Sequence, residues 1–119
     1  MGYSANAKNV MLNALAAVCV YASIHNNDPS TTGANEISGG SPAYARKGIT
    51  WNTASAGAMD DSTTPAPVFD IPAGTTVKYV GFFSALSGGT FYGSQAVTNE
   101  SYVGQGTYTL TDIDFDLNS

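Results

Sequence analysis

One stretch of sequence decides the fold: VKYVGFFSAL, residues 77–86. It is the most apolar strand-like run of the chain, and the sequence Ser87-Gly88-Gly89 follows it directly. A short glycine-containing link between two strand-like runs is typical of a β-hairpin. We therefore expect residues 77–86 to form the central strand of a sheet, with residues 90–97 returning antiparallel beside them.

Strand-like patterns also lie on both sides of this hairpin, and no helical segment separates them. Parallel strands need long crossover connections, which are usually helices, so the pattern argues against a parallel sheet. It predicts a mainly β fold, an antiparallel β-sandwich of six to eight short strands with one N-terminal helix. The other expected strands are residues 18–25, 43–53, 68–71, 106–110 and 113–117.

The apolar alternation changes phase near the end of the chain. Tyr108 and Leu110 occupy even positions, whereas Ile113 and Phe115 occupy odd ones. Because successive side chains of a strand point to opposite faces, this slip predicts a bulge or a break between two strands at residues 111–112.

The start of the chain has helical spacing instead. Apolar residues recur three and four positions apart, which predicts an amphipathic helix over most of residues 1–17. Long polar loops are expected at residues 26–42 and 54–67, and the whole chain, 1–119, is short enough to form a single domain. The expected apolar stripe of the helix consists of Tyr3, Ala7, Val10, Met11, Ala14, Leu15 and Val18.

Composition excludes several classes of partner. Four basic residues stand against nine acidic ones, giving a net charge of −5. No basic patch is present to neutralise phosphates, so we expect no nucleic-acid partner and no membrane partner. Charged residues make up only 11% of the chain, against about 25% in ordinary soluble domains. Such a surface suits contact with other protein.

The residues with catalytic potential point to structural roles. Cys19 alternates within an apolar strand, where a thiol behaves as a small hydrophobe. His25 closes the same strand, and we expect it to hydrogen-bond to loop backbone rather than to act as a base. We therefore expect no enzymatic activity, no catalytic residues and no cofactor.

The alternating acids Asp112, Asp114 and Asp116 are spaced like the opening of a calcium loop. The glycine and the glutamate that complete such a loop are missing, so an edge strand with an acidic, solvated face is favoured. No metal site is predicted, and whether these acids bind an ion stays open.

Three stretches together resemble a known family: IHNNDP at residues 24–29 with TGANE at 32–36, SGGSPAYARK at 38–47, and FDIPAGTTV at 69–77 with GTYTL at 106–110. The chain is similar in these stretches to small proteins of actinobacterial phages that are called tail fibre or minor tail proteins. The resemblance implies a non-enzymatic virion protein, made in the host cytoplasm, that acts through protein–protein assembly.

Two alternatives stay open beside the tail assignment. A compact domain without a fibrous repeat also fits a capsid decoration protein on the phage head. A carbohydrate-binding module for the host surface would need exposed aromatic side chains, with Tyr44 and Tyr102 as candidates. The expected partners are other virion proteins and further copies of this chain in a homo-oligomer, with a host-surface glycan as a further possibility. The expected assembly contacts are Tyr3, Met11 and Leu15 on the helix and Asn35, Glu36 and Ile37 on the loop.

Overall fold

The computed structural model describes residues 2–63, 65–111 and 113–117, and its secondary structure is one helix and eight strands. All strand pairings within these residues are antiparallel, so the mainly β prediction is confirmed. The elements are α1 (Ala5–Val18), β1 (Tyr21–His25), β2 (Lys47–Gly48), β3 (Ala58–Asp60), β4 (Val68–Ile71), β5 (Thr75–Phe83), β6 (Phe91–Tyr102), β7 (Gly106–Thr109) and β8 (Asp114–Asp116).

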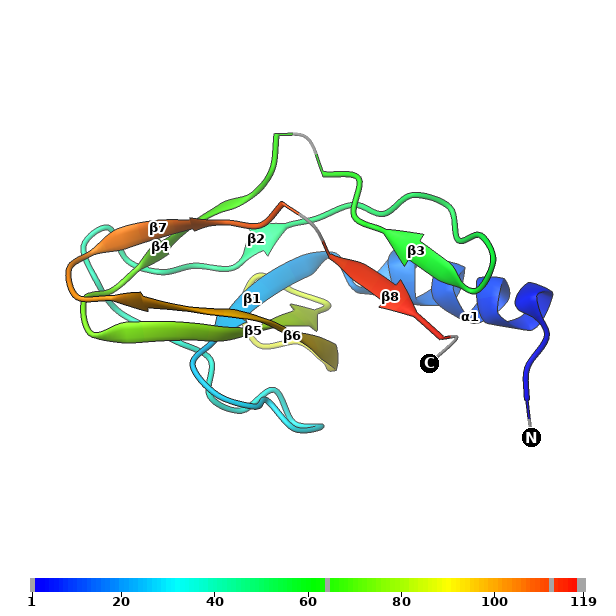
Figure 1. Cartoon of the computed structure of the whole chain (residues 1–119), viewed down its shortest axis with the longest axis horizontal. Coiled ribbons are helices and arrows are strands. Elements are labelled where there is room, and N and C mark those ends of the chain that lie inside the picture. Colours follow the sequence, from blue (N-terminus) through cyan, green and yellow to red (C-terminus); the bar gives the residue numbers. More distant parts are fainter. Residues whose placement is uncertain (1, 64, 112, 118–119) are drawn as a thin grey trace.

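The strands form one sheet of four and two ribbons of two. The sheet has the order β2-β1-β5-β6, and the ribbons are β4-β7 and β3-β8. Strand β5 lies inside the sheet, between β1 and β6, as its apolar sequence predicts. In Figure 1 the β4-β7 ribbon lies over the β5-β6 hairpin, while α1 and the β3-β8 ribbon occupy the opposite end of the long axis.

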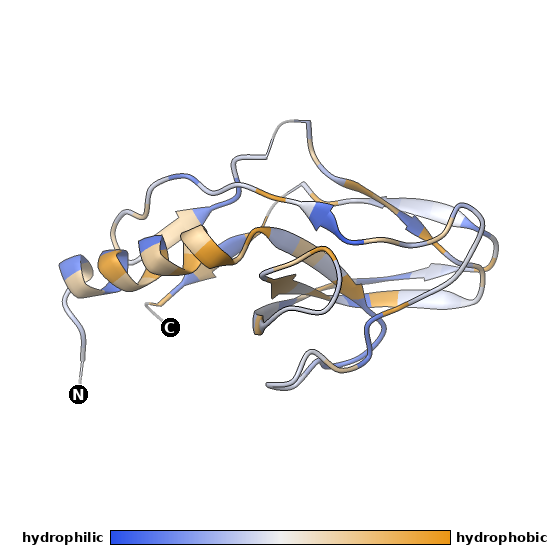
Figure 2. Cartoon of the chain, turned by 180° about the vertical axis from the view of Figure 1, so that it is seen from behind, coloured by the Kyte–Doolittle hydropathy of each residue, from blue (hydrophilic) through white to orange (hydrophobic). Residues whose placement is uncertain are grey.

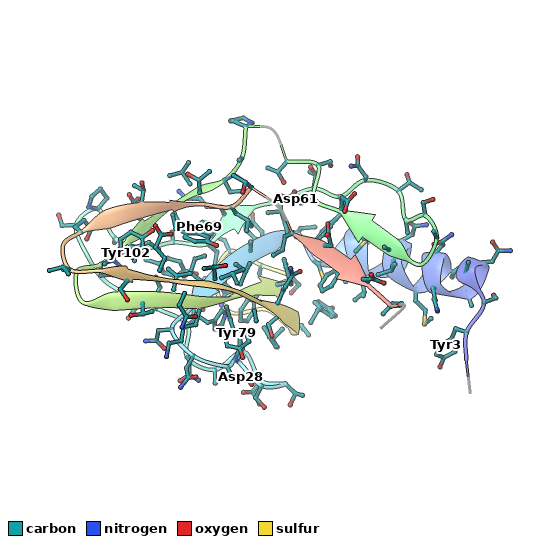
Figure 3. The ribbon with its side chains drawn as sticks, viewed as in Figure 1. Tyr3, Asp28, Asp61, Phe69, Tyr79 and Tyr102 are labelled. Atoms are coloured by element: carbon teal, nitrogen blue, oxygen red, sulfur yellow. The ribbon has the colours of Figure 1, made fainter. Side chains whose placement is uncertain are left out.

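The main core lies between the sheet and the β4-β7 ribbon. Phe69 of β4 and Phe82 of β5 are fully buried, and so are Ile24 of β1 and Val80 of β5. Figure 3 shows Phe69 between these two layers. A second, smaller cluster joins the helix to the β3-β8 ribbon and is made of Leu12, Ala54 and Met59.

Several expected boundaries need correction. The strand expected at residues 43–53 is reduced to β2, and the loop expected at 54–67 contains β3, whose Met59 is buried opposite Phe115 of β8. Strand β6 continues to Tyr102, through residues that were expected to form a loop, because its partner β5 already begins at Thr75. The two missed strand segments, β3 and the end of β6, are short or polar and give no local strand signal, whereas at residues 43–53 the strand pattern extends over more residues than the pairing with β1 uses.

The change of phase near residues 111–112 corresponds to a break between two strands. Strand β7 ends at Thr109 in the ribbon with β4, whereas β8 begins at Asp114 and pairs with β3. Leu110 and Ile113 on either side of the break are both buried. The one-residue slip therefore lets the chain leave one ribbon and join another while keeping apolar side chains inside.

Candidate functional site

The ionisable and polar side chains of the fold gather where the long loop 26–42 lies against the sheet. We call this group the loop-anchor network; it consists of Ser23, His25, Glu36, Tyr44 and Arg46. Two of its members lie on β1 and three on the segment that follows it. All of these residues except Ser23 come from the stretches that carry the family resemblance.

His25 joins β1 to the loop through both ring nitrogens. Its Nδ1 lies 2.8 Å from the carbonyl oxygen of Ala34, and its Nε2 lies 2.8 Å from the hydroxyl oxygen of Ser23. A carbonyl oxygen can only accept, so Nδ1 carries the proton and Nε2 accepts from the Ser23 hydroxyl. The expected contact of His25 with loop backbone is thus confirmed. His25 and Ser23 are both fully buried, so neither can reach a substrate in this conformation.

Arg46 holds the loop from the other side. Its Nε and Nη2 donate to the two carboxylate oxygens of Glu36, each at 2.9 Å. Its Nη1 donates to the carbonyl oxygens of Ala85 and Gly88 in the β5-β6 turn, at 2.9 and 2.8 Å. The guanidinium also lies over the ring of Phe83, 3.6 Å from the ring centre. One side chain thereby ties the loop to the central hairpin.

Tyr44 completes the network. Its hydroxyl donates to Glu36 at 2.7 Å and accepts from the backbone N–H of Ile24 at 3.0 Å. Burial, together with the neighbouring Glu36 carboxylate, raises the pKa of Tyr44 far above its ordinary value. The ring stacks against Phe69. Tyr44 therefore belongs to the interior and does not provide the exposed aromatic face that a sugar-binding module requires.

Charges inside the network favour a paired, ionic arrangement. Burial alone would raise the pKa of Glu36, but the hydrogen bonds from Arg46 and Tyr44 and the charge of Arg46 outweigh it and leave that pKa below its ordinary value. Burial lowers the pKa of His25, which keeps its ring neutral. Every polar group of the network thus has a partner, and the chemistry of the site is that of an anchor.

The loop itself is tied down by backbone as well as by side chains. Asn26 donates to Asn35 and Ile37 donates to Ile24, each N–H to the carbonyl oxygen at 3.1 Å. Gly33, with a φ of +78°, approaches the rings of Phe83 and Phe91 so closely that a Cβ there would lie within 3.0 Å of them. Figure 3 shows Asp28 on the part of the loop that extends away from the sheet. The loop-anchor network therefore holds in place a protruding loop, residues 26–42, which we call the arm.

Cys19, Trp51 and Tyr102 also make contacts within the fold. Cys19 is fully buried, and burial raises the pKa of its thiol to about 11. Trp51 donates from Nε1 to the carbonyl oxygen of Cys19 at 2.9 Å and stacks on Phe115. The hydroxyl of Tyr102 donates to the carbonyl oxygen of Thr107 at 2.7 Å.

Two of the three alternating acids lie on β8. Asp112 lies outside the described residues, and Asp114 and Asp116 are exposed on β8. Among the residues that the structure describes, no group of three His, Cys, Asp or Glu side chains is placed to hold a metal ion. The described residues also form no pocket.

On the helix, the fold uses only part of the expected stripe: Leu15 and Val18 pack against the core. Leu12 is fully buried, whereas Val10, which the stripe included, is 70% exposed. The polar residues Asn9 and Asn13 lie on the fold-facing side, where their Oδ1 atoms accept from the N–H groups of Gly57 and Ala54, each at 2.9 Å. This face has helical spacing, with Asn9, Leu12, Asn13 and Ala16. Because two of these residues are polar asparagines, a search for apolar periodicity does not detect it.

The six expected assembly contacts fall into two groups. Tyr3 is 57% exposed at the free end of α1 (Figure 3), Met11 is half-buried on its flank, and Asn35 is exposed on the arm. The other three take part in the fold: Leu15 packs against both clusters, Glu36 binds Arg46, and Ile37 is only 6% exposed. The loop therefore does not present Ile37 to solvent, contrary to the expectation of an exposed apolar group there. The sequence argument missed Arg46 and considered Tyr44 only as an exposed aromatic residue, although both stand in the SGGSPAYARK stretch that carried the resemblance.

Comparison with known proteins agrees with that resemblance in its general part. The family model described as podophage GP4 fiber I protein gp80 matches residues 3–113 of this chain. No curated protein and no solved structure matches it. Within the described residues, no helix has the length and apolar character needed to cross a membrane.

Proposed function

The chain belongs to the podophage fiber I protein family, and from this premise we propose that it is a non-enzymatic tail component that acts by assembling with other virion proteins. The family match carries the proposal because it extends over nearly the whole chain, residues 3–113. The family is one of structural phage fibre proteins.

The geometry supports an assembly role in two ways. The groups able to do chemistry, such as His25, Glu36 and Arg46, are engaged in holding the arm on the sheet. At the other end of the molecule, Tyr3 and Val10 expose apolar surface on and beside α1. Inward-facing polar groups and outward-facing apolar groups are the arrangement expected of a protein that binds other proteins.

We place the protein in the virion, as a minor tail or tail-fibre-type component of an actinobacterial phage, made in the host cytoplasm. The resemblance described from the sequence supports the host group. The expected partners are the neighbouring tail proteins. A host-surface glycan receives less support, because Tyr44, one of the two candidate aromatic residues, stacks against the buried Phe69.

The test is quantitative mass spectrometry of purified virions, which reports copies of this chain per major capsid subunit. A low ratio, corresponding to a handful or a few dozen copies per particle, is expected for a tail component. A ratio close to one or higher would assign the protein to the shell as a decoration protein and overturn the tail assignment. Absence from the particle would overturn the virion role itself.

A further inference from the structure

The helix α1 has two apolar sides, and the fold covers only one of them. Leu12 and Ala16 face the small cluster around Met59. Nearly opposite Leu12 lies a second set of uncharged apolar side chains, which we call the outer arc. With 3.6 residues per turn it covers about 120° of the helix circumference. It consists of Ala7, Val10, Met11, Ala14 and Ala17, while Val18 at the end of the helix packs against the main core.

Every residue of the outer arc has solvent access. Val10 is 70% exposed, Ala14 and Ala17 are exposed, and Ala7 and Met11 are half-buried. Figure 2 shows apolar colouring repeated along the length of α1. Tyr3, immediately before the N-cap Ser4, is 57% exposed beside the same helix. An apolar face of this width on a surface helix is the kind that other helices bury.

The spacing within the arc indicates what kind of surface it fits. Ala7, Val10, Ala14 and Ala17 are separated by three, four and three residues. This is the repeat by which helices pack along each other in coiled coils and bundles, with the side chains of one entering the gaps of the next. The small alanines allow two helix backbones to approach closely. The surface therefore suits another helix better than a strand or an extended peptide.

Charge favours an identical helix as the partner. Self-packing brings like residues together, so any charge in the arc would oppose it. The arc has none, and its polar neighbours Asn6 and Asn13 are uncharged. Lys8, the one charged residue of α1, lies about 120° from the centre of the arc. The chain has a net charge of −5, but α1 contains no Asp or Glu, so packing two copies of α1 against each other brings no two carboxylates of this helix together.

We propose that the outer arc of α1 packs against the outer arc of a second copy of this chain. This inference deepens the proposed assembly function, on which it rests, by naming one partner of the helix. A helix of 14 residues is about 21 Å long and supplies only part of the roughly 800 Å² per partner found in a standard interface. Self-association is therefore weak in solution and depends on concentration, and the crowded setting of a fibre strengthens it.

The experiment is sedimentation velocity of the purified full chain over a concentration series up to about 1 mM, a range that covers weak association. The wild type is expected to associate. Val10→Glu places a charge in the arc and is expected to raise the apparent dissociation constant about tenfold or more, because the carboxylate would be buried without a partner. Thr98→Glu, the same change of charge at an exposed position of β6, is the matched control and is expected to associate like the wild type. Circular dichroism and Trp51 fluorescence check that both variants are folded.

A mixing experiment tests whether the arc meets itself. Val10→Glu and Val10→Lys are each expected to weaken association, and their equimolar mixture is expected to associate more tightly than either alone, since opposite charges then face each other. A wild type that stays monomeric throughout the series would overturn the proposal. So would a Val10→Glu variant that associates like the wild type, or a mixture that shows no recovery. Because this experiment uses the isolated chain, its failure leaves the virion copy number as a separate test of the proposed function.

Discussion

Arg46 and Glu36 form a bidentate ion pair in which Nε and Nη2 of the guanidinium each lie 2.9 Å from a carboxylate oxygen. The side chains are 9% and 22% exposed, so the pair is largely withdrawn from water. The third nitrogen of Arg46 binds two carbonyl oxygens of the β5-β6 turn. A contact between residues ten positions apart thus also fixes a turn some forty positions away. Arm, sheet and hairpin turn are coupled through one guanidinium.

The first prediction concerns this pair. Glu36→Gln keeps the shape of the side chain but removes its charge, leaving Arg46 largely buried without a counter-ion. Losing one partner of a buried pair typically costs 3–5 kcal/mol, and partial exposure places this site near the lower end, at about 3 kcal/mol. Urea unfolding followed by Trp51 fluorescence measures the change. Glu100→Gln makes the same substitution on the exposed part of β6 and is expected to change stability by less than about 0.5 kcal/mol. Equal effects of the two substitutions would contradict the anchoring role of Glu36.

The second prediction concerns pH and His25. Burial lowers the pKa of His25 in the folded chain below its ordinary value of 6.5. Between that value and the lower folded one, the unfolded chain binds a proton that the folded chain does not, so stability falls as the pH falls. We expect the free energy of unfolding to be constant above about pH 7 and to decrease from pH 6.5 downward.

Unfolding curves at about pH 7.5, 6.5 and 5.5 test this expectation, because these values lie above, at and below the ordinary histidine pKa of about 6.5. His25→Gln removes the titrating group and is expected to flatten the profile over this interval, although the variant is less stable at every pH. Glu36 contributes a further loss only at lower pH, because its folded pKa is lowered and its stabilisation disappears as the carboxylate is protonated below about 4.5. A His25 signal in NMR that titrates at or above 6.5 in the folded chain would refute the prediction.

The third prediction concerns a glycine that the anchor network requires. A Cβ on Gly81 of β5 would lie 2.5 Å from Nε2 of His25 and 2.6 Å from the hydroxyl oxygen of Ser23. Neither side chain can withdraw without breaking its hydrogen bonds, so Gly81→Ala is expected to cost about 3 kcal/mol, at the upper end of the usual overpacking range. Gly104→Ala is the control, since nothing lies within 4 Å of a Cβ at that position. The midpoints of thermal unfolding of the two variants should differ clearly. A Gly81→Ala protein as stable as Gly104→Ala would show that His25 and Ser23 can shift without loss of stability.

Local sequence signals predicted the parts of this fold that local chemistry determines. The central strand, the β5-β6 hairpin, the N-terminal helix and the break near residues 111–112 all follow from periodicity and turn residues. The β3-β8 ribbon does not, because Ala58–Asp60 is too short and too polar to stand out until Phe115 supplies a partner for Met59. A strand that depends on a segment more than fifty residues away leaves little trace in its own sequence.

The candidate site shows the same division. His25 was placed against loop backbone because a turn sequence follows it, and the structure agrees. The sequence predicts Glu36 only as a surface contact, since its partner Arg46 stands beyond a glycine-rich turn and sequence spacing does not indicate that the two residues meet. Arg46 could have been singled out by the rarity of basic residues, since the chain has only four of them. The role of Tyr44 has no comparable signal, because its partner Ile24 stands twenty positions earlier in the chain.

The last prediction tests which side of α1 the fold uses. Leu12 is fully buried against Ala54 and Met59, so Leu12→Ala should cost about 2–5 kcal/mol through lost burial and the cavity it leaves. Val10, two positions earlier and 70% exposed, should tolerate Val10→Ala with a change below about 0.5 kcal/mol. The measurement is urea unfolding at low protein concentration, where self-association does not contribute. The pair is well matched, because both substitutions shorten an aliphatic side chain within one turn of the same helix. If Val10→Ala destabilised the monomer as much as Leu12→Ala, the outer arc would belong to the chain's own core and would not be available to a second copy.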